Sequence, residues 1–470
     1  MAVACLGPAT GDAVSYYLSP DGNDSATGDS GRRPWRTLAR ASRADFRPGD
    51  HLLLKGGEVF PGTLTLDARD AGTARKPVVV GSFGKGKAVI EAGDGDGVMA
   101  RDAGGIRIER LVITGSGRAK NSGSGIRLVN TLPGSVRIGP VSVDDVEVRG
   151  FGREGLVVRG DAADGSRSGF RDVKITRVSA HDNAYYGILV NGNWSETSTA
   201  YAHSGVVVRD CTMFDNPGDP DFMDNHSGSG ILLEDTDGGE IDRCRAWNNG
   251  WLCRSPAGGP CGIWAAAARR ITIRRCEAFD NRTAADSDGG GFDFDGGVSE
   301  SLMEDNYSHG NDGAGYLVYA YAGSPFVFRN NIVRNCVSDN DGRKNHYGGI
   351  LVASDGQPVR DILIERNTVR LPPAPGATPF AVLARNVTNV MFRGNRFETS
   401  GGVPLVDGAV PLDSVRFEGN SYRVKGNGTF VINWEGRTFG NVREWAVATG
   451  QETRGGKLLS PLPRAGARRR

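Results

Sequence analysis

The sequence lacks a long hydrophobic run and has no excess of charge of either sign. No stretch of 18 consecutive apolar residues occurs, which is about the length that a membrane-spanning helix needs. Lys and Arg total 56 against 55 Asp and Glu, so the formal net charge is +1. Proteins that bind nucleic acid or anionic membranes normally carry a basic excess. We therefore expect no transmembrane segment and no nucleic-acid partner.

Cysteines and aromatic residues are also scarce, whereas glycine is abundant. Seven cysteines and 8% aromatic residues stand beside 69 glycines in 470 residues. A hydrophobic content of 38% is that of a folded chain with many turns, not of a disordered one. A chain of this length usually forms several domains unless it is one extended repeat.

The two ends of the chain carry little sign of a packed structure. The first residues lack the charged and apolar regions of a signal peptide, although Ala2-Val-Ala-Cys5 resembles the end of a lipoprotein cleavage site. An arbitrary start with an isolated cysteine is the alternative interpretation. We expect residues 1–14 to be a disordered or processed leader and residues 451–470 to be a solvated tail. The protein is predicted to be secreted or at the cell surface, with Cys5 as a possible lipid anchor.

A repeat organises the middle of the chain. A glycine followed by a large apolar residue recurs every 24 to 43 residues, and a second short apolar segment lies between successive pairs. Such spacing, with alternating strands and no helical period, predicts a β-solenoid. The pairs are Gly125-Ile126, Gly155-Leu156, Gly187-Ile188, Gly230-Ile231, Gly262-Ile263, Gly291-Phe292, Gly315-Tyr316 and Gly349-Ile350. The second segments include Val206–Val208, Ile271–Ile273, Phe326–Phe328 and Ile362–Ile364.

Cysteine and asparagine recur at matching places in this repeat. Because equal positions of successive coils stack, the cysteines should form an internal row of reduced thiols rather than a metal site, which needs a tetrahedral arrangement. Cys253 and Cys261 lie instead in a longer loop and are predicted to be able to close a disulfide. The row comprises Cys211, Cys244, Cys276 and Cys336, with Asn306 in the equivalent slot, and Asn216, Asn249, Asn281 and Asn311 follow five residues after it.

The N-terminal segments resemble those of a known superfamily. Tyr16–Asp24, Pro34–Ala41 and Pro48–Gly57 are similar to the opening of right-handed parallel β-helix proteins, which include polysaccharide lyases, glycoside hydrolases and sugar epimerases. The resemblance implies one all-β parallel β-helix over residues 15–450, capped at its N-terminus by a short helix at Pro34–Ala41. It also implies a carbohydrate-active enzyme with a polysaccharide or oligosaccharide substrate. We expect residues 434–450 to form the C-terminal cap.

Strand alternation predicts which side chains leave the core. If Ile231 points inward, then Glu234 points outward, and the same register places Asp293 and Asp295 outward. Residues two apart on a strand are about 6.5 Å apart and coils about 4.8 Å, so Glu234 and Asp295 should be about 9–10 Å apart. Inverting glycosidases separate their two carboxyls by about 6.5–9.5 Å. We therefore predict an inverting glycoside hydrolase with Asp293, Asp295 and Glu234 as catalytic carboxyls, with acid and base unassigned and no cofactor required.

Other polar and aromatic residues are predicted to hold the sugar. Trp264 should offer an apolar ring face and Tyr319 a hydroxyl, with hydrogen bonds from His226 or His309. Asp312, Lys344 and His346 are further candidate substrate-binding residues. Loops at residues 191–204, 216–228 and 251–261 are expected to wall the cleft.

Two other functions stay open at this point. Phe292-Asp-Phe-Asp295 is similar to part of the signature of a calcium-dependent pectate lyase family, in which the preceding positions hold paired aspartates; here they are Gly289 and Gly290. This resemblance implies a polysaccharide lyase with Ca²⁺ at Asp286, Asp288, Asp293 and Asp295, and with Tyr319 or Lys344 as the base. The third hypothesis is a carbohydrate-binding solenoid without catalysis.

Overall fold

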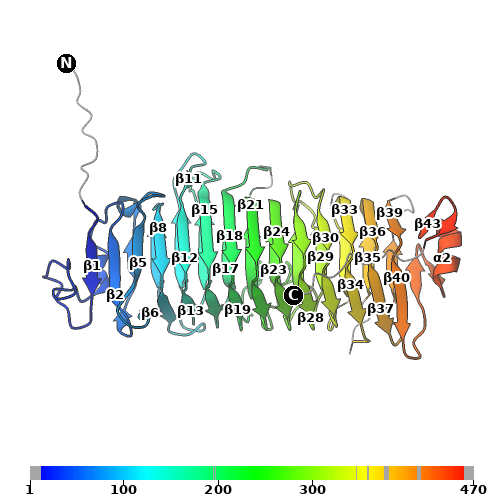
Figure 1. The fold of residues 1–470 in the computed structure, drawn as a ribbon, viewed down its shortest axis with the longest axis horizontal. Helices are drawn as coiled ribbons and strands as arrows, with labels where there is room; N and C mark the ends of the chain where they lie inside the picture. Colours follow the sequence, from blue (N-terminus) through cyan, green and yellow to red (C-terminus); the bar gives the residue numbers. More distant parts are fainter. Residues whose placement is uncertain are drawn as a thin grey trace, which may run out of the picture.

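The chain forms one long rod of stacked coils, with the N-terminal strands at one end and the C-terminal helix at the other (Figure 1). The computed structural model describes residues 12–193, 195, 197–345, 347–356, 359–374, 380–409 and 414–459. Each coil contributes one strand to each of three parallel sheets. This is the parallel β-helix that the repeat predicts. No helix in the described part of the chain is long and apolar enough to cross a membrane.

The first sheet runs the length of the rod and follows the second segment of each repeat. Three of the four expected segments lie in it, but Phe326–Phe328 is not a strand, and its coil uses Ile332–Arg334 instead. The strands are β1 (Ser15–Leu18), β2 (His51–Lys55), β5 (Val78–Phe83), β8 (Ile106–Glu109), β12 (Val141–Asp144), β15 (Gly169–Thr176), β18 (His203–Arg209), β21 (Thr236–Asp242), β24 (Arg269–Arg274), β27 (Leu302–Glu304), β30 (Ile332–Arg334), β33 (Val359–Glu365), β36 (Val387–Arg393) and β39 (Val415–Glu418), with β11 (Arg137–Ile138) beside β15.

The second sheet contains the strands of the glycine–apolar pairs, as expected. Its pairing is parallel until the last two strands, which turn back on each other. The strands are β4 (Leu64–Leu66), β7 (Val98–Arg101), β10 (Ile126–Asn130), β14 (Leu156–Gly160), β17 (Tyr186–Asn191), β20 (Ser229–Glu234), β23 (Cys261–Ala266), β26 (Gly290–Asp295), β29 (Tyr316–Ala320), β32 (Ile350–Ser354), β35 (Val382–Arg385), β38 (Val406–Ala409), β41 (Ile432–Trp434) and β42 (Arg437–Phe439).

The third sheet is made of short strands between the other two. They are β3 (Val59–Pro61), β6 (Ala88–Gly93), β9 (Leu111–Gly115), β13 (Glu147–Arg149), β16 (Ser179–His181), β19 (Thr212–Phe214), β22 (Arg245–Trp247), β25 (Glu277–Phe279), β28 (Tyr307–His309), β31 (Val337–Asp339), β34 (Thr368–Leu371), β37 (Arg396–Ser400) and β40 (Ser421–Lys425).

The interior is built from equal positions of successive coils. Phe292 stacks on Tyr316 with ring centroids 5.2 Å apart, and both are buried in the main core. The expected asparagine row is a chain of hydrogen bonds, in which each side-chain amide donates to the next, for example Asn216 Nδ2 to Asn249 Oδ1 at 2.9 Å and Asn249 Nδ2 to Asn281 Oδ1 at 2.9 Å. These bonds satisfy buried polar groups and fix the stacking register.

The thiol row is confirmed, but the disulfide prediction is wrong. Cys244 donates its backbone N–H to Cys276 Sγ at 3.4 Å, and the six cysteines from Cys211 to Cys336 are buried and free. Cys261 begins β23 and directs its thiol at Asp293, whereas Cys253 lies under Gly218. Their side chains therefore face different neighbours. Cys5 lies outside the described residues.

Both ends of the rod are capped. The helix α1 (Leu38–Ala41) begins after Thr37, whose hydroxyl accepts the N–H of Arg40, and α2 (Val442–Thr449) packs Trp445 against the last coil. A 3-10 helix, η1, spans Ala68–Asp70. The hairpin of β43 (Thr453–Arg454) and β44 (Lys457–Leu458) follows α2.

Residues that we expected in the tail belong to the C-terminal cap. Gln451 and Glu452 are buried, because Gln451 accepts the N–H of Phe417 and Glu452 bonds Asn420. The packed structure therefore continues beyond residue 450.

Candidate functional site

Two rows of side chains project from the outer face of the second sheet, in the predicted register. The strand pairing aligns Glu234, Ala266 and Asp295 on β20, β23 and β26, and this set continues to Tyr319 and Ala353. We call these five residues the glutamate row. A second row runs parallel to it, two residues earlier on each strand. We call it the tryptophan row, and it comprises Leu232, Trp264, Asp293, Leu317 and Leu351.

The tryptophan row is covered rather than open to solvent, which corrects our expectation for Asp293 and Trp264. Their exposed fractions are 2% and 4%. His226, from the segment between β19 and β20, lies edge-on to the Trp264 ring at a centroid distance of 4.9 Å and bonds the hydroxyl of Tyr186 at 2.9 Å. The tryptophan ring face is therefore occupied by protein. Sequence alternation places a side chain outside the core, but it does not reveal a loop folded over it.

The glutamate row remains partly open. Glu234 and Asp295 are both partly exposed, and the residue between them in the row is the small Ala266. Two carboxyls thus face each other across one coil with no large side chain from that coil between them. Asp295 accepts the N–H of Gly296 at 2.6 Å.

Four carboxyl groups lie along these two rows and the loop before β26, and each has a raised pKa. Burial, followed by the neighbouring charges of Asp295 and Asp288, holds the pKa of Asp293 well above its usual range. Burial, together with the neighbouring charges of Asp288 and Glu234, also holds the pKa of Asp295 well above its usual range. Burial raises the pKa of Glu234 to about 7 and that of Asp288 to about 6, although Asp288 accepts the N–H of Gly259 at 2.7 Å. The cluster can therefore keep protons near neutral pH.

Among the described residues, no lysine or arginine acts on Asp293 or Asp295 strongly enough to lower either pKa. Glu234 is different, because Arg167 and Arg159 partly offset its desolvation. Arg167 pairs with Asp235 in a buried ion pair directly after Glu234, at the left-handed turn that ends β20. This pair fixes the backbone from which Glu234 projects.

Tyrosines surround the carboxyls, and sequence reasoning found only one of them. Tyr319 donates its hydroxyl to Asp355 Oδ2. Burial and then the charges of Asp295 and Glu234 raise the pKa of Tyr321, and burial and then Asp288 raise the pKa of Tyr347 to about 12. Tyr186 on β17 bonds His226, and burial followed by the charge of Glu234 raises the pKa of Tyr186. These four residues come from three segments without a shared motif, so only the fold brings them together.

Three other sequence-predicted residues serve the scaffold. His309, expected to bond the sugar, lies instead on β28 of the third sheet, away from the carboxyl rows of the second sheet. It stacks on Phe279 at a centroid distance of 4.8 Å and bonds Glu277 at 3.2 Å. Asp312 accepts the N–H of Thr283 and pairs with Arg282. Lys344 donates to the carbonyls of Thr283 and Ala285 at 2.7 Å each, which ties down the loop before β26. His346 lies outside the described residues.

The described residues do not form the set of calcium ligands that the lyase hypothesis requires. Asp286 is exposed, whereas Asp288 belongs to the carboxyl cluster. No group of three or more His, Cys, Asp or Glu side chains in this part of the chain is arranged to hold a metal ion. The carboxyls are close enough to perturb one another's pKa but are not gathered around one point.

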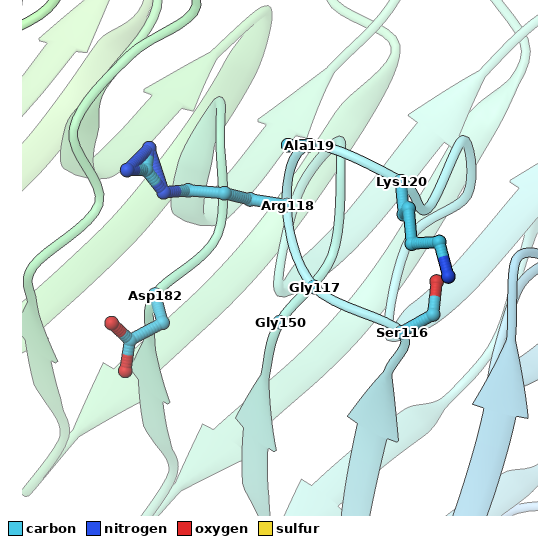
Figure 2. A pocket seen from close by; sticks show the side chains of 7 residues that line it. All are labelled: Ser116, Gly117, Arg118, Ala119, Lys120, Gly150 and Asp182. Carbon is cyan, nitrogen blue, oxygen red and sulfur yellow. The ribbon is translucent and has the colours of Figure 1, made fainter.

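A separate hollow of about 340 Å³ lies on the third-sheet side, after β9 and β16. Arg118 and Lys120 extend to opposite sides of it, with Gly150 on the next coil and Asp182 on the coil after that (Figure 2). It contains none of the four clustered carboxyls. Its lining is Ser116, Gly117, Arg118, Ala119, Lys120, Gly150 and Asp182.

Comparison with known proteins agrees with this architecture. The family model described as "Right handed beta helix region" matches residues 129–369. The GH136 lacto-N-biosidase from Eubacterium ramulus has a similar structure, with a TM-score of 0.58 and 16% sequence identity over 87% of this chain and 68% of that chain. XylC in complex with xylose has a TM-score of 0.53 and 10% identity over 90% of this chain and 86% of that one. These similarities show a shared fold. No curated protein matches the sequence.

Proposed function

The chain belongs to the right-handed β-helix family, and we propose that it is a carbohydrate-active enzyme that hydrolyses glycosidic bonds with inversion. The observation that carries the proposal is the pair Glu234 and Asp295, partly exposed and facing across Ala266. Positions two coils apart are separated by about 9–10 Å. That spacing is close to the range in which an inverting pair encloses a sugar and a water.

The charges favour one assignment of roles. Burial raises the pKa of Glu234 to about 7, and the charges of Arg167 and Arg159 partly offset this burial. Burial and the neighbouring carboxylates of Asp288 and Glu234 hold the pKa of Asp295 well above its ordinary value, and no cation among the described residues offsets them. We therefore assign the ionised carboxylate to Glu234 and the protonated carboxyl to Asp295. Asp295 then protonates the leaving-group oxygen, and Glu234 removes a proton from the water that attacks the anomeric carbon. One C–O bond breaks and one forms, and both protons are accounted for.

Asp293 has a different place in this proposal. Its side chain is almost fully covered, so it is less accessible to the scissile bond than its two neighbours in the glutamate row. Its carboxyl lies two residues from Asp295 on β26, and the two influence each other's protonation. We therefore assign proton transfer to Asp295 and Glu234 and a substrate-contacting role to Asp293.

A neutral sugar fits the site better than a uronate polymer. A β-eliminating lyase needs a cation or metal to neutralise the substrate carboxylate. The described residues place four carboxyls here and no cation that lowers the pKa of Asp293 or Asp295. An anionic polymer would meet repulsion. The lacto-N-biosidase and the xylose-bound protein among the structural neighbours support a sugar substrate, and a glycan substrate supports export to the medium or the cell surface.

The test is a screen of neutral and acidic oligosaccharides with wild type, Glu234→Gln, Asp295→Asn and Asp286→Asn. Asp286 is exposed in the loop before β26 and serves as the matched control. We expect new reducing ends without ultraviolet absorbance, lost in the first two variants and kept in the control. Unsaturated products absorbing in the ultraviolet would establish a lyase instead. Binding without any cleavage would establish a carbohydrate-binding solenoid.

A further inference from the structure

Two neighbouring residues of the tryptophan row each have a polar side-chain atom that is buried without a hydrogen-bond partner. They are Nε1 of Trp264 and Oδ1 of Asp293, and the two residues are register partners on β23 and β26. Buried polar groups in folded proteins are nearly always paired, because losing water without a replacement bond costs free energy. An unpaired donor and an unpaired acceptor on neighbouring residues therefore call for an explanation.

Their surroundings distinguish these atoms from other unpaired ones. The indole nitrogens of Trp434 and Trp445 are also unpaired, but those rings pack against one another in the apolar C-terminal cap. Trp264 instead lies beside Asp293 within the carboxyl cluster. The other oxygen of Asp293 has only the Cys261 thiol, at 3.8 Å, as a weak partner. The pair thus combines a free N–H and a free carboxyl oxygen at one end of the proposed cleft.

A sugar hydroxyl is the group that fits both atoms. A hydroxyl both donates and accepts, so one hydroxyl can accept the indole N–H and donate to the carboxyl oxygen. Asp293 lies about 6.5–7 Å along the strand from Asp295. One pyranose ring can span such a distance from its glycosidic oxygen to a hydroxyl on its far side.

We propose that Trp264 Nε1 and Asp293 Oδ1 bind one hydroxyl of the neutral sugar whose glycosidic bond lies between Glu234 and Asp295. This inference rests on the proposed hydrolase function and adds a specificity-determining pair to it. A site built to bond a hydroxyl discriminates strongly against a sugar that lacks it, because the buried partners are then left unpaired.

The hydroxyl can reach the pair only when the covering segment moves. His226 lies on the Trp264 ring, and the same segment is held at Tyr185, whose ring stacks on Phe222 at 5.0 Å. Beyond these contacts the tip is open to solvent, with Met223 47% exposed. Loops of this kind open and close over substrates on the microsecond-to-millisecond scale.

The test follows the indole N–H directly. The full chain is labelled with ¹⁵N at its tryptophan indoles, seven in all, and the Trp264 signal is assigned from its loss in Trp264→Phe. Xylose, glucose, galactose, N-acetylglucosamine and lactose are then titrated. We expect at least one of these sugars to shift the Trp264 signal in a saturable manner. Trp264→Phe should weaken the binding of that sugar about tenfold, while Trp247→Phe, a control on the third sheet, should leave it unchanged.

Monodeoxy analogues of the binding sugar identify the hydroxyl. In wild type, one deoxy analogue should bind more weakly than the parent sugar. In Trp264→Phe, that analogue and the parent sugar should bind almost equally well. This difference between the two proteins is the signature of a coupled pair. The inference would be overturned if no sugar shifted the Trp264 signal, or if removing the hydroxyl weakened binding equally in both proteins. A buried water would then be the partner of the two atoms. If the protein hydrolyses a sugar but no sugar shifts the Trp264 signal, this inference alone is wrong. If a sugar binds at Trp264 but is not hydrolysed, only the proposed function is wrong.

Discussion

Glu234 and Asp295 hold the same position on strands two coils apart, and the coil between them contributes only the methyl group of Ala266. Stacked coils usually fill such a row with side chains that touch, as Phe292 and Tyr316 do inside the core. Here a small side chain, 5% exposed, lies between two carboxyls that both hold protons more tightly than usual. The proposed reaction requires a sugar to bind over that small side chain.

A larger side chain at position 266 should therefore stop the reaction without unfolding the protein. We expect Ala266→Leu to lower kcat/KM by at least about 100-fold, because it obstructs the position of the reacting sugar. Ala353→Leu, in the same row beyond Tyr319, is the matched control and should retain activity. Both variants are compared by kinetics and by thermal unfolding. Full activity in Ala266→Leu would show that catalysis does not take place between these carboxyls.

The pH profile of kcat/KM should be bell-shaped. Activity should rise as the pH increases through about 7, because Glu234 must lose its proton to act as the base. It should fall at higher pH, where Asp295 loses the proton that it must donate. Asp288→Asn removes a negative charge that raises the pKa of Asp295, so the alkaline limb should move to lower pH. A profile without an acidic limb near 7 would contradict the assignment of Glu234.

The same carboxyl should destabilise the fold at neutral pH. The folded-state pKa of Glu234, about 7, lies above its ordinary value of 4.5. Its contribution to stability is thus fully present below pH 4.5 and is lost as the pH rises through 7. Glu234→Gln should unfold at a higher denaturant concentration than wild type at about pH 8, by a free energy on the order of 1–2 kcal/mol. The two proteins should converge near pH 4; a constant difference would mean that ionisation is not the cause.

Reducing agents should have no effect on the described part of the fold. Its six cysteines are free and buried. Their thiols should resist a thiol reagent in the native protein and react only after unfolding. The melting temperature should be the same with and without dithiothreitol. A lower melting temperature in dithiothreitol would show a disulfide, with Cys253 and Cys261 as the first pair to examine by peptide mapping.

The sequence predicts the scaffold well because the scaffold is periodic. Alternation in Ile231–Glu234 and the repeated glycine–apolar pairs are enough to place Asp295 two coils from Glu234 in the same row. Burial of Asp293 was not predictable in this way, since the covering segment with His226 has no period of its own. His309 was expected to bond the sugar, but it lies on a strand of another sheet, and its position in the sequence near the Gly315-Tyr316 pair does not reveal this.

The stereochemistry of the first product tests the central proposal most directly. Proton NMR recorded within minutes of adding enzyme to a cleaved oligosaccharide shows which anomer is released before mutarotation. We predict the anomer opposite to that of the substrate, because a water activated by Glu234 attacks while Asp295 protonates the departing oxygen. A product that retains the substrate configuration would contradict the pairing of these two carboxyls across Ala266.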